Sequence, residues 1–524
     1  MAAKAKLNQR EQEPQTPFLR KSGTATQLIV GGEPFVMLSG EIHNSSSSCL
    51  EYMEPVWDKL VAMNCNSAVV PIYWELVEPE EGKLDFALLD GVIRGAREHK
   101  LRLVLLWFAT WKNALSGYTP AWVKKDLERF PRAQPRQGEN SGAITSLSNA
   151  ACEADSRAFA AVMRHLREID EEQQSVLMIQ IENETGLLGA SRDHCPMAED
   201  AFAQDVPSEL MNYLQAHKES LLPELIEIWE SAGRRASGAW PEVFGPGAGA
   251  DEVFMAWHVA RFVDRVTAAG KAEYPLPMYA NAWLCRLDGT QEPGTYPSGG
   301  PVSRMMDVWR AAAPHIDLLA PDIYAEDFRA YCASFARSGN PLFIPEAHRD
   351  ERAAANVFYA LAEHDAICFA PFGIDGMADS NPYAEANAFL AEIMPLIVKH
   401  QGTGQMIGLV QQGEKEIRRV DLGGHRLRIQ FGQPMEKGKV PGRGLIIAIE
   451  PDEYLVAGSG FSVDFLPKPD GLPNVDFLSV DEGRFEKGAW IPGRRLNGDE
   501  SGHGRGLHLY GGLRACRIKL YSYA

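Results

Sequence analysis

Short apolar runs alternate with longer stretches of helical period, and this alternation constrains the fold more than any other feature. The runs are rich in β-branched residues. Such runs are typical of parallel strands buried on both faces, and the stretches between them are typical of crossover helices. The runs that we predict to be strands are residues 34–40, 67–71, 102–107, 176–181, 277–281, 316–321, 342–345 and 367–371.

Amphipathic stretches separate these runs. Residues 84–99 and 156–170 each place their apolar side chains on one face of a helix. Eight strand and helix units predict an α/β fold, the (β/α)₈ TIM barrel, over residues 18–400. Residues 186–274 are too long for a plain connection, so we predict an insertion there that shapes the rim of the site.

The ends of the chain differ from this central part. Residues 401–524 alternate with period two between Gly, Pro, Asp and Asn turns, which predicts a β-rich, sandwich-like domain with strands at 426–431, 444–449, 460–465 and 517–523. Residues 1–17 are polar and charged and indicate a mobile tail without a secretory leader or anchor. We therefore expect a soluble protein, cytoplasmic as the chain stands and periplasmic if a leader was removed.

Net charge and the length of the apolar runs limit the kinds of partner and substrate that the chain can bind. The formal net charge is −18, which repels phosphate backbones and argues against nucleic acid. No apolar run reaches the roughly 18 residues needed to cross a bilayer, so no membrane partner is expected. A neutral substrate suits the chain better, and a homo-oligomer is compatible with the sequence.

Two glutamates stand where a parallel barrel carries its catalytic groups, at the carboxyl ends of strands. Glu184 ends the fourth predicted strand, within Ile181-Glu-Asn-Glu184, and Glu346 follows the seventh. Strands four and seven face each other across a barrel, so the two side chains can meet at its mouth. Cleavage of an acetal with retention needs one carboxyl to protonate the leaving oxygen and one to attack the anomeric carbon. We assign Glu184 as acid/base and Glu346 as nucleophile.

Other polar residues receive more limited roles. Asn183 is a natural donor to the sugar 2-hydroxyl, and Glu182 is predicted to be structural, as the buried partner of an Arg or Lys. The histidines and cysteines lack the spacing of a metal site, so neither a metal nor another cofactor is expected. No nucleophilic serine turn and no phosphate-binding loop occurs in the sequence.

Four motifs in order resemble family 35 of the glycoside hydrolases, a β-galactosidase family of clan A with a TIM barrel and a retaining mechanism. They are Ser39-Gly-Glu-Ile-His43, Glu78-Pro-Glu-Glu-Gly82, Pro120-Ala-Trp122 and Ile181-Glu-Asn-Glu184. The chain departs from that family at Asn44, where Tyr is usual, and its Trp74-Glu-Leu-Val-Glu-Pro79 also resembles family 42, a second β-galactosidase family. The resemblance implies a divergent bacterial branch with a C-terminal β domain, some members of which remove galactosyl branches from plant xyloglucan.

The resemblance also implies binding residues. Asn183 is expected at the 2-hydroxyl, Tyr324 against the nucleophile or the sugar, and Asn113 near the galactosyl hydroxyls. Aromatic side chains at strand ends can stack on the apolar faces of sugars or simply pack in the barrel. The candidates are Tyr73, Trp74, Trp107, Trp111, Trp283 and Tyr324, with Trp283 preferred as the stacking platform.

These observations favour a retaining exo-β-galactosidase acting on terminal β-galactosyl residues of oligo- or polysaccharides. Two alternatives stay open. One is a clan A retaining β-glycosidase for a glucoside, mannoside or arabinoside. The other is a noncatalytic glycan-binding protein that kept the barrel and binds through the β domain.

Overall fold

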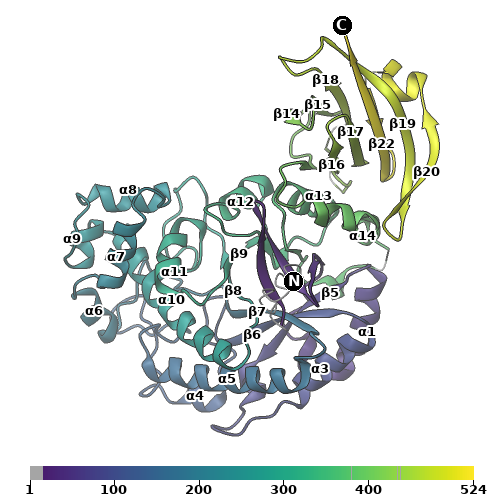
Figure 1. Ribbon diagram of the computed structural model, residues 1–524. Helices are drawn as coiled ribbons and strands as arrows, with labels where there is room; N and C mark the ends of the chain where they lie inside the picture. The colour runs from purple at the N-terminus through teal and green to yellow at the C-terminus, as the bar shows by residue number, and fades with distance from the viewer. Residues whose placement is uncertain (1–15, 379, 433–434, 437, 505) are drawn as a thin grey trace, which may run out of the picture.

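The computed structural model describes residues 16–524 except 379, 433–434, 437 and 505. Most of the predicted N-terminal tail lies outside the described residues. Within them, an α/β barrel is followed by a β domain that stands on one side of it (Figure 1).

Eight parallel strand positions form a closed ring. Six strands make one sheet, and a smaller sheet completes the ring. On one side the two sheets meet at the parallel bridge between Glu41 and Val69. On the other side they meet at the seventh strand, which Pro345 divides into two parts, one in each sheet. In ring order the strands are β4 (Met37–Leu38), β5 (Ser67–Tyr73), β6 (Arg102–Lys112), β7 (Val176–Asn183), β8 (Met278–Trp283), β9 (Leu318–Ile323), β10 with β11 (Phe343–Ile344, Glu346–Ala347) and β12 (Cys368–Phe369). The predicted parallel barrel is therefore present.

One long helix follows each strand and covers the outside of the ring (Figure 1). Inward-facing side chains such as Val104 and Leu106 form one apolar cluster, and outward-facing ones such as Val70 and Leu105 pack with the helices. Burial on both faces explains why these strands are almost wholly apolar in sequence. The helices are α1 (Leu50–Ala62), α3 (Ala87–Glu98), α5 (Asn149–Asp170), α10 (Ala248–Glu273), α11 (Met306–Ala312), α12 (Phe328–Phe335), α13 (Ala353–Glu363) and α14 (Pro382–His400), with two short helices between them, α2 (Trp74–Val77) and α4 (Ala121–Lys125).

Two helices differ from the prediction in where they begin or in which part of the fold they belong to. Helix α5 begins at Asn149, earlier than expected, because the Ser148 side chain accepts a hydrogen bond from the backbone N–H of Ala151 (3.2 Å) and caps the helix there. Helix α10, which we placed in the insertion, packs on α5 as the barrel helix after β7. Among the described residues of the predicted insertion, four helices lie outside the ring: α6 (Pro196–Phe202), α7 (Ser208–Ala216), α8 (Pro223–Ser231) and α9 (Trp240–Phe244).

A small antiparallel sheet closes the amino end of the barrel. It consists of three strands, β1 (Phe18–Ser22), β2 (Ala25–Val30) and β3 (Glu33–Phe35). Leu28 of β2 is buried in the same apolar cluster as the inward-facing strand residues, and Leu19 packs against it. The first predicted strand is therefore split between this small sheet and β4. The small sheet covers the end of the barrel opposite the carboxyl ends of the strands.

The β domain consists of two antiparallel sheets that share one core. Leu409 and Val456 come from one sheet, and Leu427 and Val463 from the other. The first sheet contains β13 (Met406–Val410), β16 (Arg443–Glu450), β17 (Glu453–Ser459), β22 (Arg514–Tyr523), β19 (Asn474–Glu486) and β20 (Ala489–Leu496). The second contains β14 (Ile417–Leu422), β15 (His425–Phe431), β18 (Phe461–Leu466) and β21 (Gly506–Leu509).

The β domain rests on helix α13. A Cβ atom at Gly408 would lie 2.7 Å from the backbone oxygen of Tyr359, so only glycine permits this approach of β13 to the helix. The N–H of Gly408 donates to Glu363 (3.0 Å), and Arg418 pairs with the same carboxylate at 2.8 Å. This contact fixes the β domain to the barrel.

We predict that Leu28→Ala destabilises the barrel by about 3 kcal/mol, because it removes a buried side chain from the closed end and leaves a cavity. Urea unfolding followed by tryptophan fluorescence measures the change. Leu478→Ala is the matched control, since Leu478 is 65% exposed, and it should change stability by less than about 0.5 kcal/mol. Equal effects of the two substitutions would contradict the role of Leu28.

Candidate active site

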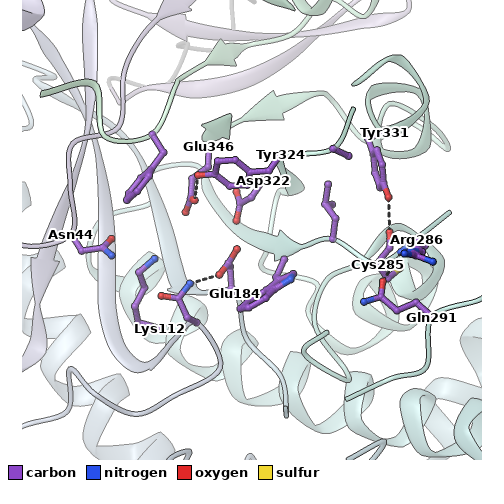
Figure 2. A pocket seen from close by; sticks show the side chains of 15 residues that line it. Asn44, Lys112, Glu184, Cys285, Arg286, Gln291, Asp322, Tyr324, Tyr331 and Glu346 are labelled. Carbon is purple, nitrogen blue, oxygen red and sulfur yellow. Dashed lines mark hydrogen bonds between the residues drawn. The ribbon is translucent and has the colours of Figure 1, made fainter. Parts of the chain in front are cut away.

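A cavity of about 430 Å³ opens at the carboxyl ends of the barrel strands (Figure 2). Its wall includes Glu184, Asp322 and Glu346 from three different strand ends, together with Lys112 and Tyr324. The volume falls within the range of small-molecule sites, roughly 300 to 1,000 Å³. A parallel barrel places its functional side chains at this end.

Glu184 is held in an uncommon backbone conformation just after β7. Its φ is +46°, in the left-handed region that non-glycine residues seldom adopt. Its N–H donates to the side-chain oxygen of Asn281 (3.0 Å), and its backbone oxygen accepts from Ala114 (3.0 Å). The Asn113 amide donates to the Glu184 carboxyl group. These bonds from two neighbouring strands direct the carboxyl group into the cavity.

Glu346 begins β11 on the opposite wall. Its carboxyl group accepts one hydrogen bond from the Tyr324 hydroxyl (2.8 Å) and one from the Asn183 amide (3.3 Å). Donors of this kind stabilise the charged form of a carboxylate and fix its direction. The hydrogen bonds from Tyr324 and Asn183 therefore fix the direction of the Glu346 carboxyl group.

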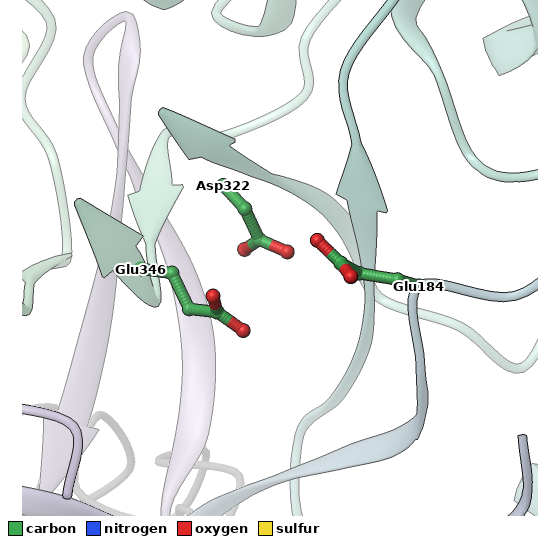
Figure 3. Close-up of side chains that lie close together, drawn as sticks. All are labelled: Glu184, Asp322 and Glu346. Atoms are coloured by element: carbon green, nitrogen blue, oxygen red, sulfur yellow. The ribbon is translucent and has the colours of Figure 1, made fainter. Parts of the chain in front are cut away.

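Three carboxyl groups converge in the cavity. Glu184, Asp322 and Glu346 each place an oxygen within 4.8 Å of an oxygen of the other two (Figure 3). Retaining glycosidases separate their two carboxyl groups by about 5 to 5.5 Å, and inverting ones by roughly 6.5 to 9.5 Å. The spacing of Glu184 and Glu346 has the geometry that a double displacement needs.

Burial and nearby charge raise the pKa values of several carboxyl groups around the cavity. Burial, and next the negative charge of Glu346, raise the pKa of Glu184 to about 7, although Lys112 opposes this. Burial and then the charge of Glu346 also raise the pKa values of Glu41 and Asp322 well above their usual range. Glu184 therefore retains a proton close to neutral pH and can act as an acid.

Lys112 supplies the positive charge in this cluster, and the sequence reasoning missed it. Burial acts to lower its pKa, but the charges of Glu346 and Glu41 outweigh this and raise it, so the side chain stays protonated. Its ammonium group makes no hydrogen bond or ion pair with the described residues and points into the cavity (Figure 2). Strand β6 runs on through Lys112, beyond the predicted end at residue 107, and that extension is the signal that could have identified it.

Glu41 and Asp322 were also missed as site residues. Glu41 lies beyond β4, 1% exposed, and Asp322 near the end of β9, 3% exposed. The Asn281 amide donates to Asp322 (2.7 Å), so one asparagine contacts both Asp322 and the backbone of Glu184. Glu41 occurs within the motif Ser39-Gly-Glu-Ile-His43 already noted, and the position of both acids at strand ends was the available signal.

Not every predicted residue reaches the cavity. Asn113, Trp283 and Tyr324 line it, and Asn183 lies behind Glu346. Trp111 does not, because its ring packs against Phe262 of α10 with the ring centroids 4.6 Å apart.

Tyr73 is likewise buried away from the wall of the cavity. Its hydroxyl lies 2.7 Å from the hydroxyl of Ser47 and donates to the backbone oxygen of Asn44 (2.8 Å). Among the described residues, neither Trp111 nor Tyr73 belongs to the lining. The structure therefore places both side chains away from this lining, because side chains alternate between the two sides of a strand end, and their contact with a sugar stays a prediction.

The prediction of a cationic partner for Glu182 was wrong. Its carboxyl group is buried beside that of Asp155 and accepts from the N–H of Trp111 (2.6 Å). Asp155 accepts from the Trp107 indole (2.8 Å) and the Thr110 hydroxyl (2.5 Å). Burial and then the charge of Asp155 raise the pKa of Glu182 well above its usual range. A second carboxyl group, that of Asp155, therefore stands where the cationic partner was expected.

The three converging carboxyl groups could in principle ligate a cation. Each already has a donor, however: Asn113 for Glu184, Asn281 for Asp322 and Tyr324 for Glu346. The ammonium group of Lys112 adds positive charge to the same cavity. The arrangement fits acid/base and nucleophilic chemistry without help from a metal, and the expectation of no cofactor stays a prediction.

Comparison with known proteins agrees with this geometry. Residues 51–248 match a family 42 model described as beta-galactosidase, and residues 383–508 match a domain of unknown function, DUF5597. A curated beta-galactosidase from Xanthomonas manihotis is 25% identical over 182 residues, which is 33% of this chain. The match spans only 27% of that protein's own length. The comparisons support a glycoside hydrolase.

Solved structures share the fold. A cold-adapted beta-galactosidase from Rahnella sp. R3 aligns with a TM-score of 0.51 at 12% identity, over 96% of this chain and 100% of its own. A catalytic mutant of a GH42 beta-galactosidase from G. stearothermophilus aligns with a TM-score of 0.50 at 12% identity, over 95% and 100%. The matching family model is family 42, so the resemblance to family 35 is not confirmed.

We predict that Lys112→Met shifts the alkaline limb of the pH–rate profile to higher pH by about one unit. Loss of a nearby positive charge raises the pKa of Glu184 further, so the proton is lost at a higher pH. The rate of hydrolysis of an aryl β-galactoside, followed from about pH 4 to about pH 10, measures the shift. Lys112→Arg keeps the charge and should leave the limb near pH 7. A limb that stays in place in the Met variant would show that Lys112 does not act on Glu184.

Proposed function

We propose that this protein is a retaining exo-β-galactosidase that releases terminal β-galactosyl residues from oligo- or polysaccharides. The observation that carries the proposal is the pair Glu184 and Glu346, whose carboxyl oxygens lie within 4.8 Å of one another across the cavity. One member has a raised pKa and the other accepts two hydrogen bonds. Environment thus separates an acid from a nucleophile.

In the first step, a Glu346 oxygen attacks the anomeric carbon while Glu184 transfers its proton to the departing glycosidic oxygen. The C–O bond to the leaving group breaks, and a glycosyl ester forms on Glu346. Ester formation removes the charge of Glu346, which is one cause of the raised pKa of Glu184. Glu184 then becomes more acidic and, now ionised, serves as the base that activates water for the second step.

Neighbouring residues suit this reaction. Asn183 donates to Glu346 through its amide nitrogen, while its side-chain oxygen is buried without a hydrogen-bond partner. Asn183 therefore positions the nucleophile, and its contact with the sugar 2-hydroxyl stays a prediction. The Tyr324 hydroxyl fixes the direction of the nucleophile. Trp283, 39% exposed at the end of β8, offers an aromatic face for stacking.

Galactose as the sugar, rather than glucose, mannose or arabinose, is supported by the beta-galactosidase model and by the curated relative. Branches of plant xyloglucan are one natural source of terminal β-galactosyl groups. A panel of aryl β-glycosides decides the sugar, since the galactoside should have the highest kcat/KM. Measurable binding of oligosaccharides without hydrolysis of any member of the panel would instead favour a noncatalytic protein.

Glu346→Ala should lower hydrolysis of an aryl β-galactoside by at least about 10⁴-fold, because no glycosyl ester can form. Added azide should restore part of the rate and give α-galactosyl azide, since the small anion attacks from the vacated side. Proton NMR of the product identifies the anomer. Ordinary turnover by this variant would remove Glu346 from the reaction.

Glu184→Ala should leave substantial cleavage of galactosides with good leaving groups, such as dinitrophenol, and abolish cleavage of those with poor ones. The rate with the activated substrate should no longer fall as the pH rises through about 7, because the carboxyl group that loses its proton there is absent. Comparison of kcat/KM across leaving groups of graded pKa provides the measurement. Equal losses for all leaving groups would contradict the assignment of Glu184 as acid.

A further inference from the structure

A second hollow adjoins the candidate active site and shares Cys285 and Arg286 with its wall. Its volume is about 350 Å³. On the far side it is bounded by Glu224, Ile228 and Ser231 of helix α8. We call this hollow, with its lining from α8 and the loop after β8, the outer pocket.

The outer pocket lies on the side from which a leaving group would depart. Figure 2 shows Asn44 and Lys112 at one end of the cavity, Cys285 and Arg286 at the other, and Glu184 between them. The backbone of Glu184 is bonded to Asn281 of β8, the strand that continues into the loop carrying Arg286. A proton given by Glu184 must go to the leaving oxygen, so the leaving group extends past Glu184.

The lining suits neutral sugars. Leu287, 44% exposed, provides an apolar surface, which matches the C–H face of a pyranose. The charges are balanced, with two acids and two arginines in the lining: Glu224, Glu227, Arg286 and Arg304. Two of these are held by ion pairs, Glu224 to the partly exposed Arg337 at 2.8 Å and Arg304 to the buried Glu252 at 3.3 Å. A wall that is polar, fixed and balanced in charge favours a hydroxyl-rich neutral ligand over an anion.

We propose that the outer pocket binds the second and later sugar units of the leaving group. The preferred substrate would then be a galactosylated neutral oligosaccharide or polysaccharide rather than a disaccharide. The inference rests on the proposed function and adds where the rest of the substrate lies. It also gives a role to helix α8, which belongs to the insertion after β7 and takes no part in the barrel wall.

The test compares three substrates on the full chain: nitrophenyl β-galactoside, lactose and a xyloglucan oligosaccharide with terminal β-galactosyl groups. The wild-type protein should have a kcat/KM at least about tenfold higher for the oligosaccharide than for lactose, which corresponds to the binding of further sugar units. Equal values for lactose and the oligosaccharide would overturn the inference. Failure to cleave any of the three would overturn the proposed function itself, and the two failures are therefore distinguishable.

Two variants locate the effect. Ser231→Trp fills the outer pocket from an exposed position at the end of α8, and Leu287→Ala removes its apolar surface. Each should lower kcat/KM for the oligosaccharide by about tenfold and change that for nitrophenyl galactoside by less than about twofold. Leu472→Ala, 49% exposed in the β domain, is the control for an exposed leucine and should change neither. Equal losses on both substrates, or none on the oligosaccharide, would place the leaving group elsewhere.

Discussion

A buried group of charges at the carboxyl end of the barrel governs what this protein can do. Glu184, Asp322 and Glu346 line a cavity that contains a single ammonium group among its described lining, that of Lys112, and the buried Glu41 acts on Lys112 through its charge. Several carboxylates this close together cannot all be ionised out of water, so protons must be distributed among them. Burial and neighbouring charge raise the pKa of Glu184 within this group, and this observation supports the proposed assignment of Glu184 as the acid.

The distribution depends on a backbone that cannot relax. Both Glu182 and Glu184 have positive φ, +60° and +46°, and strained residues of this kind persist only where neighbouring structure holds them. Hydrogen bonds to Asn281 and from Ala114 hold the backbone of Glu184, and the N–H of Trp111 donates to the Glu182 carboxyl group. Strands β6, β7 and β8 are linked in this way, so the direction of Glu184 is a property of the barrel rather than of one loop.

The insertion and the β domain extend the barrel on two sides. The four helices of the insertion and the β domain lie on opposite sides of the ring (Figure 1). The β domain is attached through α13, where Gly408 and Glu363 meet. Helix α8 of the insertion instead approaches the loop after β8 and completes the outer pocket. A rigid barrel with variable loops at its carboxyl end is a common way to change substrate without changing chemistry.

The sequence by itself determined the pattern of strands and helices and the two glutamates at opposed strand ends. It could do so because burial on both faces leaves a continuous apolar run, and because the end of such a run is visible in one dimension. It could not determine which way a side chain points once a strand ends, and so Trp111 and Tyr73 were placed at the cavity, although both are buried elsewhere. Only the tertiary structure brought Lys112 and Asp322 beside the glutamates and paired Glu182 with an acid. Shifted pKa values and charge balance depend on distances between residues far apart in the chain, and a sequence contains no record of those distances.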